Sequence, residues 1–235
     1  MPESRAERRR VLGMIPAKGG SKRLARKNVL TLAGKSLLQW AVDAGTGSGV
    51  IDRLIVSTED EEIAKVARGL GADVPFMRPE HLARDPHGVV DVALHALATL
   101  REAGQSYDTL IILLPTCPLR TAEDVSAAYR MFVEEKASFM MSVSACDKPP
   151  FTALRLEEGN RLVPWFPEYM GRKTGQLPAA YRANGAIHVL DVKAFEREKS
   201  YYAQPLLAYV MPPERSVDID NAEDLQLAEI VLARK

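Results

Sequence analysis

The sequence has few cysteines and no long apolar run, and each absence excludes a class of protein. Two of its 235 residues are cysteines, Cys117 and Cys146, which is too few for the disulfide framework of a small secreted domain. No apolar run reaches the roughly 18–20 residues that cross a bilayer, and segment 1–10 is polar and basic, without the apolar stretch of a signal peptide. We therefore expect a cytoplasmic protein with reduced thiols, no membrane association and a flexible tail over residues 1–10.

An excess of charge of either sign is also missing. The 31 basic and 31 acidic residues cancel, so no overall field recruits nucleic acid or an anionic membrane. A local cluster of charge is therefore more informative than the total. With 235 residues, 46% of them hydrophobic, the chain is long enough to form one substantial α/β domain over residues 1–235.

Short apolar runs alternate with amphipathic segments along the chain. Strands are predicted for residues 11–17, 54–57, 109–114, 139–145, 186–190 and 206–210, with a short extended piece at 74–77. Helices are predicted for residues 36–45, 59–70, 89–103, 121–136 and 222–233. Ser36 is expected to be the N-cap of the first helix. This alternation is typical of an α/β fold with three layers and a mostly parallel sheet.

The alternation stops between Asp147 and Pro178, in a stretch rich in proline and aromatic residues. Residues 154–163 predict a hairpin that turns at Gly159 and Asn160. Exposed aromatic residues beside turns often mark a contact surface, but a long loop packed on its own domain explains the composition equally well. We expect residues 147–180 to leave the main sheet.

A basic loop follows the first predicted strand. It runs from Lys18 to Asn28 and contains five cations, Lys18, Lys22, Arg23, Arg26 and Lys27. In α/β sheets, ligands bind beyond the carboxyl ends of the strands. The adjacent Gly19 and Gly20 would let backbone amides approach phosphate oxygens, which the cations would also contact. A solvated basic turn is the alternative, but the position after a buried strand favours phosphate binding.

The segment Gly34-Lys35-Ser36 resembles the end of a P-loop but does not complete one. The pattern requires a glycine five residues before Gly34, where Val29 stands. We interpret Gly34 as part of a turn.

Two carboxylates lie close together near the C-terminus. In an extended segment Asp218 and Asp220 would point to the same side, and Mg²⁺ binds one or two carboxylates together with substrate phosphates. Alternatively, Asp220 caps the following helix with Glu223 as its partner in a capping box. The histidines and cysteines show no metal-ligand spacing, and no nucleophile-elbow motif is present. Phosphoryl chemistry, which needs positioning, cations and a metal, is the natural expectation.

Five segments carry a more specific pattern. They are residues 15–28 (IPAKGGSKRLARKN), 76–85 (FMRPEHLARD), 113–120 (LLPTCPLR), 181–187 (YRANGAI) and 218–220 (DID). In this order they resemble the acylneuraminate cytidylyltransferases, the CMP-sialic acid synthetases. The resemblance implies a Rossmann-like fold of the nucleotide-diphosphosugar-transferase type, with CTP as donor and a nine-carbon 2-keto sugar acid as acceptor. It also implies a homodimer in which the excursion at 147–180 reaches the partner subunit.

The resemblance also implies roles for single residues. Triphosphate and ribose would be bound by Lys18, Gly19, Gly20, Ser21, Lys22, Lys27 and Asn28. Arg78 would help to recognise cytosine, and Arg182 and Asn184 would lie on the acceptor side. Asp218 and Asp220 would hold Mg²⁺ and place the anomeric hydroxyl for attack on the α-phosphorus. Lys27 and the metal would then stabilise the departing diphosphate.

The chain departs from the family pattern at four positions. Lys18 stands in place of the commoner arginine, Leu114 in place of glutamine, Cys117 in place of serine and His188 in place of tyrosine. Lys18 keeps the charge but loses the bidentate fork of arginine, and Leu114 removes a polar contact with the acceptor. N-acetylneuraminate, legionaminate, pseudaminate and a deaminated sialic acid therefore all remain open as acceptors. A catalytically silent nucleotide-binding module is the non-enzymatic alternative.

Overall fold

A six-stranded sheet forms the centre of the molecule. The computed structural model describes residues 9–21 and 23–234. The strands are β1 (Val11–Pro16), β4 (Arg53–Ser57), β5 (Thr109–Ile112), β6 (Phe139–Ala145), β9 (Tyr181–Asp191) and β10 (Leu206–Val210), in the order β10-β6-β9-β5-β1-β4. All neighbouring pairs are parallel except those of β9, which runs antiparallel to β5 and β6. The predicted mostly parallel sheet is confirmed.

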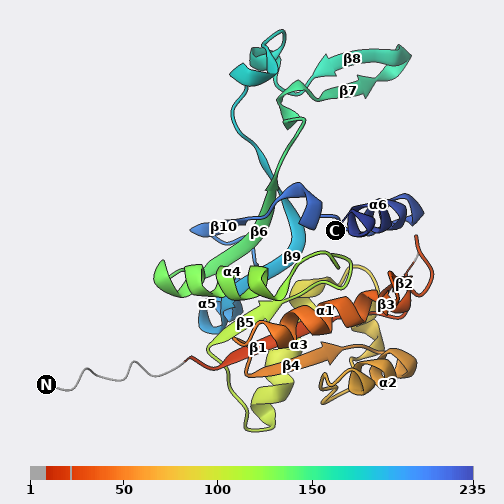
Figure 1. The fold of residues 1–235 in the computed structure, drawn as a ribbon. Helices are drawn as coiled ribbons and strands as arrows, with labels where there is room; N and C mark the ends of the chain where they lie inside the picture. The colour runs from red at the N-terminus through yellow and green to blue at the C-terminus, as the bar shows by residue number, and fades with distance from the viewer. Residues whose placement is uncertain (1–8, 22, 235) are drawn as a thin grey trace, which may run out of the picture.

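Helices cover both faces of the sheet (Figure 1). They are α1 (Leu37–Gly47), α2 (Glu61–Gly69), α3 (Val89–Glu102), α4 (Ala122–Glu134), α5 (Val192–Glu198) and α6 (Ala222–Ala233). Apolar residues of α1, α2 and α4 pack on one face, and those of α3 and α5 pack on the other, so the three predicted layers are confirmed. None of the helices in the described part of the chain is long and apolar enough to span a membrane.

A third, smaller apolar cluster joins α6 to the start of α1. Leu32, Leu37 and Ile219 are fully buried there together with Ala228 of α6. Leu32 belongs to a two-stranded ribbon of β2 (Thr31–Leu32) and β3 (Lys35–Ser36). The predicted turn at Gly34 is confirmed, because its φ is +82° between these two strands.

Side-chain caps explain where the helices begin. The Ser36 hydroxyl accepts from the amide of Gln39 at the start of α1, as predicted. At α6 the cap is Asn221, which forms a capping box with Asp224. The alternative in which Asp220 caps this helix with Glu223 is therefore wrong, and the Asp220 carboxylate is left for other contacts.

Three local predictions need correction. The strand predicted at 186–190 begins earlier, because β9 runs through Gly185, whose φ is +70°, from Tyr181. Helix α5, which follows β9, was not predicted. Residues 74–77 form no strand; a single bridge joins Asp73 to Ile55 instead.

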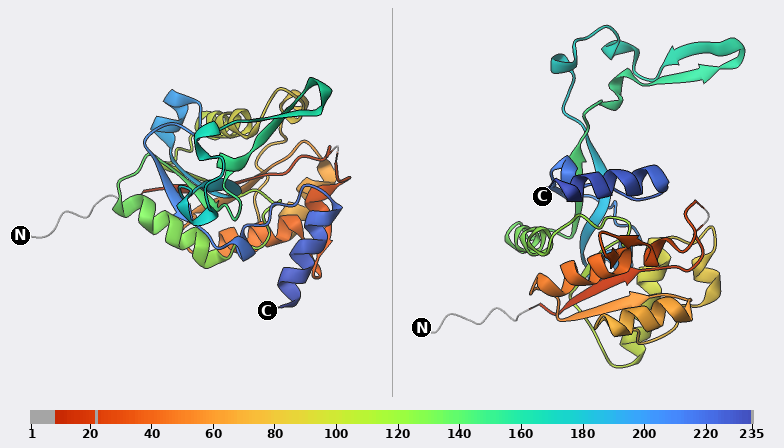
Figure 2. Two further views of the ribbon diagram at one scale, coloured as in Figure 1. Left: turned by 90° about the horizontal axis from the view of Figure 1, so that it is seen from above. Right: turned by 45° about the vertical axis from the view of Figure 1, so that its right-hand side comes forward.

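An arm of residues 146–180 leaves the sheet between β6 and β9, where Figures 1 and 2 show it projecting clear of the sheet and its helices. It contains the hairpin of β7 (Leu154–Glu157) and β8 (Arg161–Pro164). The predicted hairpin is confirmed, with positive φ at Gly159 and Asn160 in its turn. Its side chains bury little surface, since Leu156 is 67% exposed.

Short 3-10 helices occur in the connections. They are η1 (Lys27–Val29), η2 (Glu80–Ala83), η3 (Pro150–Thr152), η4 (Glu158–Asn160), η5 (Pro167–Tyr169), η6 (Thr174–Gln176) and η7 (Pro213–Arg215). Residues 1–8 of the predicted tail lie outside the described residues. Arg9, at its end, is bonded to Thr109 and Asp191 at the base of the sheet.

Candidate active site

The carboxyl ends of β1 and β5 lie beside a cavity of about 350 Å³, a size typical of small-molecule sites. The loop after β1, the segment around η2 and the turn after β5 form its wall. The lining residues are Pro16, Lys18, Ser21, Arg23, Lys27, Asn28, Arg78, Leu82, Ala83, Asp85, His87, Gly88, Val89, Val92, Leu114, Pro115 and Thr116. The topology thus brings together three of the segments that carried the sequence pattern.

The basic loop is held by a hydrogen bond within the loop and by close packing against the N-cap residue of α2. The Asn28 amide, which is buried, donates to the carbonyl of Lys18 at 2.7 Å. A Cβ on Gly19 would lie 2.5 Å from Asp60 Oδ2, so close packing requires a glycine there, while Gly20 faces open space. Lys18 and Ser21 line the cavity, and their role as phosphate ligands stays a prediction. Lys22 lies outside the described residues.

Glu59, which the sequence analysis did not select, joins the basic loop to Arg78. One carboxylate oxygen accepts from the amide of Gly19 at 2.8 Å, and the other contacts Arg78 Nη2 at 2.5 Å. Desolvation on its own would raise the pKa of Glu59, but the hydrogen bonds from Arg78 and from backbone amides hold this pKa below its usual value. An acid two residues after the end of β4, at the edge where ligands bind, was the signal that could have identified Glu59.

Arg78 is buried and fixed in orientation. Its side chain is 3% exposed, and its amide donates to the carbonyl of Thr58 at 2.8 Å. The guanidinium Nε has no hydrogen-bond partner among the described residues although it is buried. Since Arg78 also lines the cavity, an acceptor atom of a bound molecule could satisfy this donor.

The two carboxylates of the segment 218–220 lie beside the cations of the basic loop. Asp220 contacts Lys27 Nζ at 2.9 Å and Arg23 Nη2 at 2.8 Å. Desolvation opposes the effect, but the Lys27 hydrogen bond and the two cationic charges hold the pKa of Asp220 below its usual value. Asp218 lies over the turn after β5, with Oδ1 3.6 Å from Cys117 Sγ.

Asp218 has the opposite electrostatic environment. Desolvation raises the pKa of Asp218, and the Asp220 charge raises it further, against a hydrogen bond with Thr116 and the charge of Lys27. Asp218 is exposed as a whole residue, so the desolvation acts on the covered side of its carboxyl, toward Cys117. Both carboxylates are thus close enough to Lys27, and to each other, to interact electrostatically.

This pair of carboxylates could hold a divalent cation such as Mg²⁺. Desolvation is the main cause of the raised pKa of Asp218, and a bound cation would offset the Asp220 charge that adds to it. The described residues contain no cluster of three or more His, Cys, Asp or Glu side chains suited to a metal. Mg²⁺ does not need such a cluster, because one or two carboxylates and substrate phosphates suffice.

The predicted acceptor residues on β9 do not line the cavity. Arg182 is exposed on the strand. Asn184 is 3% exposed; its oxygen accepts from the Ser142 hydroxyl at 2.6 Å, and its nitrogen donates to the Ser216 hydroxyl at 2.9 Å. The Asn184 amide therefore joins β6 to the segment that precedes Asp218.

The four positions that depart from the family pattern have different surroundings. Lys18 and Leu114 line the cavity. Cys117 is fully buried, and burial raises the pKa of its thiol far above the usual value. His188 is buried against Tyr201, with ring centroids 4.7 Å apart, and burial lowers its pKa to about 4. Only Lys18 and Leu114, of these four, can meet a ligand in the cavity directly.

Three relatives of this chain are named as cytidylyltransferases or CMP-sugar-acid synthases. Residues 12–233 match the family model described as Cytidylyltransferase. A pseudaminic acid cytidylyltransferase of Campylobacter jejuni is 31% identical over 94% of this chain and 95% of its own length. A CMP-N,N'-diacetyllegionaminic acid synthase of Legionella pneumophila is 32% identical over 94% and 95% of the two chains. An N-acylneuraminate cytidylyltransferase of Escherichia coli is 30% identical over 97% of this chain but 53% of its own length.

Solved structures with the same fold are more distant in sequence. A CMP:2-keto-3-deoxy-manno-octonic acid synthetase complexed with CTP has a TM-score of 0.69 and 15% identity, covering 96% of this chain and 99% of its own. A 4-diphosphocytidyl-2C-methyl-D-erythritol synthase of Anaerococcus prevotii has a TM-score of 0.65 and 10% identity over the same shares. These likenesses establish the fold.

Proposed function

This chain belongs to the cytidylyltransferase family, and we propose that it transfers CMP from CTP to the anomeric hydroxyl of a nine-carbon 2-keto sugar acid, releasing diphosphate. The observation that carries this proposal is one cavity lined by the basic loop and Arg78, whose lining residues Lys27 and Thr116 contact Asp220 and Asp218. Residues 1–235 would act as one cytidylyltransferase domain. The cytoplasmic location expected from the sequence stays a prediction.

On the donor side, the basic loop would bind the triphosphate. Lys18, Ser21 and Lys27 line the cavity, and Gly20, which faces open space, leaves room for a phosphate group beside the loop, while Gly19 would support the loop through its bond to Glu59. Asn28 would support the loop through the Lys18 carbonyl, and Lys22 would add charge. Arg78 would present its guanidinium to the base, oriented by Glu59. These positions let fixed cations meet the charge that develops on the departing diphosphate.

Asp218 and Asp220 would hold Mg²⁺ beside the triphosphate. The ion would add positive charge next to the α-phosphorus and the departing oxygens. Without a ligand, Lys27 forms an ion pair with Asp220, and because Lys27 also lines the cavity it could turn toward a phosphate. Asp218, beside Thr116, would orient the hydroxyl of the acceptor. We therefore propose Lys27, Asp218 and Asp220 as the catalytic residues.

The acceptor proposal follows from the relatives and from Leu114. The relatives that match over nearly their full length are named for pseudaminic and legionaminic acids. Leu114 lines the cavity with an apolar surface, where an amide would favour a more polar sugar. We expect acids of the pseudaminate or legionaminate kind to be better acceptors than N-acetylneuraminate. Asn184, whose amide is occupied by protein groups, would support the acceptor site, and Arg182 would face the acceptor from β9.

The arm of residues 146–180 would form a homodimer, with the predicted insertion 147–180 as the contact surface. Exposed apolar side chains are concentrated there: Leu156 is 67%, Leu162 60% and Trp165 59% exposed. Apolar surface of this kind on a projecting hairpin is costly in water and typical of a contact surface. A second copy of the chain is the partner that the family resemblance implies.

Diphosphate release with CTP and Mg²⁺ across a panel of 2-keto sugar acids tests this function. We expect release with at least one nine-carbon acid, and a preference for CTP when UTP, ATP and GTP compete. A Leu114→Gln variant should shift the preference toward N-acetylneuraminate. Silence with every acceptor would favour the catalytically silent nucleotide-binding module, and dominant use of UTP would contradict the role of Arg78.

A further inference from the structure

The segment between β10 and α6 carries both catalytic carboxylates but has little regular structure. It runs over residues 211–220 and contains only the short helix η7. The amide of Ile219 donates to the carbonyl of Thr116 at 2.8 Å, and this one backbone bond joins the segment to the turn after β5. Since a metal site requires ligands fixed to within a fraction of an ångström, the segment needs further anchors.

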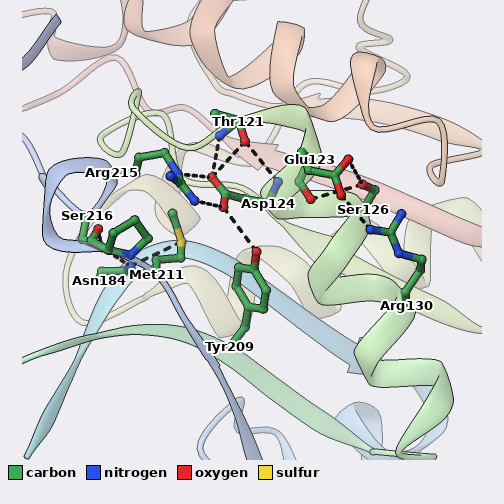
Figure 3. A network of polar contacts seen from close by, with 11 residues as sticks. Thr121, Glu123, Asp124, Ser126, Arg130, Asn184, Tyr209, Met211, Arg215 and Ser216 are labelled. Carbon is green, nitrogen blue, oxygen red and sulfur yellow. Dashed lines mark hydrogen bonds and ion pairs between the residues drawn. The ribbon is translucent and has the colours of Figure 1, made fainter. Parts of the chain in front are cut away.

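Asp124 provides the strongest of these anchors. Its carboxylate is 2% exposed and accepts two hydrogen bonds of 2.8 Å from Arg215, one to each oxygen. Thr121 donates its amide and hydroxyl to one of these oxygens, and the Tyr209 hydroxyl donates to the other at 3.2 Å. Figure 3 shows Arg215 and Tyr209 converging on Asp124 from different elements.

Helix capping alone does not account for this arrangement. Asp124 is the third residue of α4, and its bonds to Thr121 complete a capping box that needs no partner from another element. The carboxylate is nevertheless buried and meets a planar guanidinium that comes from 91 positions away. A two-point contact between arginine and a carboxylate fixes direction as well as distance. Arg215 is therefore held in one orientation, three residues before Asp218.

A second contact fixes the next residue of the segment. The Ser216 hydroxyl accepts from the Asn184 amide and donates to the carbonyl of Pro212 at 2.9 Å. Asn184 in turn accepts from Ser142 on β6. Two consecutive residues, Arg215 and Ser216, are thus bonded to α4 and to the sheet, immediately before the carboxylates.

We propose that Arg215, held by Asp124, is a positioning residue that fixes Asp218 and Asp220 against Thr116 and Lys27. The assignment rests on the proposed function, because it gives the two carboxylates their catalytic role. Arg215 and Asp124 touch neither substrate nor metal. Their effect is to set the distance between the carboxylates and the basic loop, as residues behind metal ligands do.

Arg215→Lys tests this role, because lysine keeps the charge and loses the two-point contact. We expect the Mg²⁺ concentration for half-maximal rate to rise roughly tenfold, with a smaller change in the KM for CTP. Amide hydrogen exchange over residues 216–220 should be faster in the variant without any ligand. Arg9→Lys is the matched control, since Arg9 contacts Asp191 at 2.6 Å at the far end of the sheet; it should change neither measurement.

The outcomes separate a positioning role from a structural one. Arg215→Lys with a lower unfolding temperature but an unchanged Mg²⁺ requirement and unchanged exchange at 216–220 would overturn the proposal. If Arg215→Lys does not fold, the pair Asp124→Asn with Arg215→Gln removes both charges and is measured in the same way. If the unaltered protein transfers no CMP, the proposed function fails, and the exchange measurement alone then decides: faster exchange supports the anchoring by Arg215, and equal exchange overturns it.

Discussion

Asp220→Asn is expected to tighten the binding of CTP when no metal is present, while abolishing metal-dependent transfer. Without a ligand, the Asp220 carboxylate is bonded to Lys27 at 2.9 Å and to Arg23 at 2.8 Å. Both cations line the cavity, so the carboxylate competes with the triphosphate for them. A bound cation would neutralise Asp220 and release both side chains, and the amide of asparagine imitates that release without the metal.

The size of the effect follows from the exposure of the two pairs. Asp220 is 34% exposed, Lys27 14% and Arg23 69%, and solvent screens pairs of this kind to about 0.2–1 kcal/mol each. Freeing both cations contributes about 0.4–2 kcal/mol, which is a gain in CTP affinity of about twofold to about thirtyfold. The loss of one negative charge near the triphosphate acts in the same direction.

Titration calorimetry with CTP in the presence of a chelator measures this directly. Asp43→Asn is the control, because Asp43 forms an equivalent ion pair with Lys35 at 2.6 Å outside the cavity. The affinity of this control variant for CTP should equal that of the unaltered chain. Equal or weaker binding of CTP by Asp220→Asn would refute the reasoning. That result would mean that Lys27 and Arg23 do not exchange between the carboxylate and the nucleotide.

Three further variants test other parts of the account. Arg78→Met should weaken CTP binding by about tenfold or more, as expected for the loss of a charged donor, and should reduce the preference for CTP over UTP in a competition assay. Burial lowers the pKa of His188 to about 4, whereas a histidine in the unfolded chain has a pKa near 6.5. As the pH falls, the unfolded chain therefore takes up a proton before the folded one. The free energy of unfolding should drop by roughly 3 kcal/mol between pH 6.5 and pH 4. In urea unfolding, the free energy of unfolding of His188→Phe should therefore fall less between pH 7 and pH 4 than that of the unaltered chain. Leu156→Glu combined with Leu162→Glu should leave a monomer in sedimentation velocity where the unaltered chain is expected to form the proposed homodimer.

Each of these three predictions would be contradicted by a specific result. Arg84→Met removes an exposed arginine from the segment that follows Arg78, and an equal loss of CTP affinity there would remove the special role of Arg78. If acid lowers the free energy of unfolding of His188→Phe as much as that of the unaltered chain, carboxylates rather than His188 cause the loss. Val133→Glu changes an apolar residue that is 44% exposed on α4, so dissociation by this variant as well would count against the arm as the contact surface.

The sequence predicted the layers and the cavity edge because both depend on local patterns. Strands such as β1 and β5 are buried on both sides and therefore appear as continuous apolar runs. Helix starts such as that of α1 depend on one capping side chain. Once the strands are parallel, the loops after them must meet at one edge, which brought the basic loop to the cavity.

The contacts that hold the site together could not be predicted in this way. Glu59 reaches Arg78 across 19 positions, and Arg215 reaches Asp124 across 91, so neither pair has a fixed spacing. Asn184 was predicted on the acceptor side because its neighbours match a family segment, whereas the bonds of its buried side chain to Ser142 and Ser216 follow from no local pattern. Burial of a polar residue on a strand with an irregular register depends on the three-dimensional pairing.

The central claim is that the anomeric hydroxyl of the acceptor attacks the α-phosphorus of CTP, and the products of one reaction test it most directly. The reaction contains CTP, Mg²⁺ and a nine-carbon 2-keto sugar acid whose anomeric hydroxyl carries a heavy oxygen isotope, and mass spectrometry identifies the products. Attack by that hydroxyl on the α-phosphorus predicts labelled CMP-sugar and unlabelled diphosphate. A labelled CDP-sugar with inorganic phosphate, or unlabelled CMP formed by hydrolysis, would contradict the claim that this cavity transfers CMP to a sugar acid.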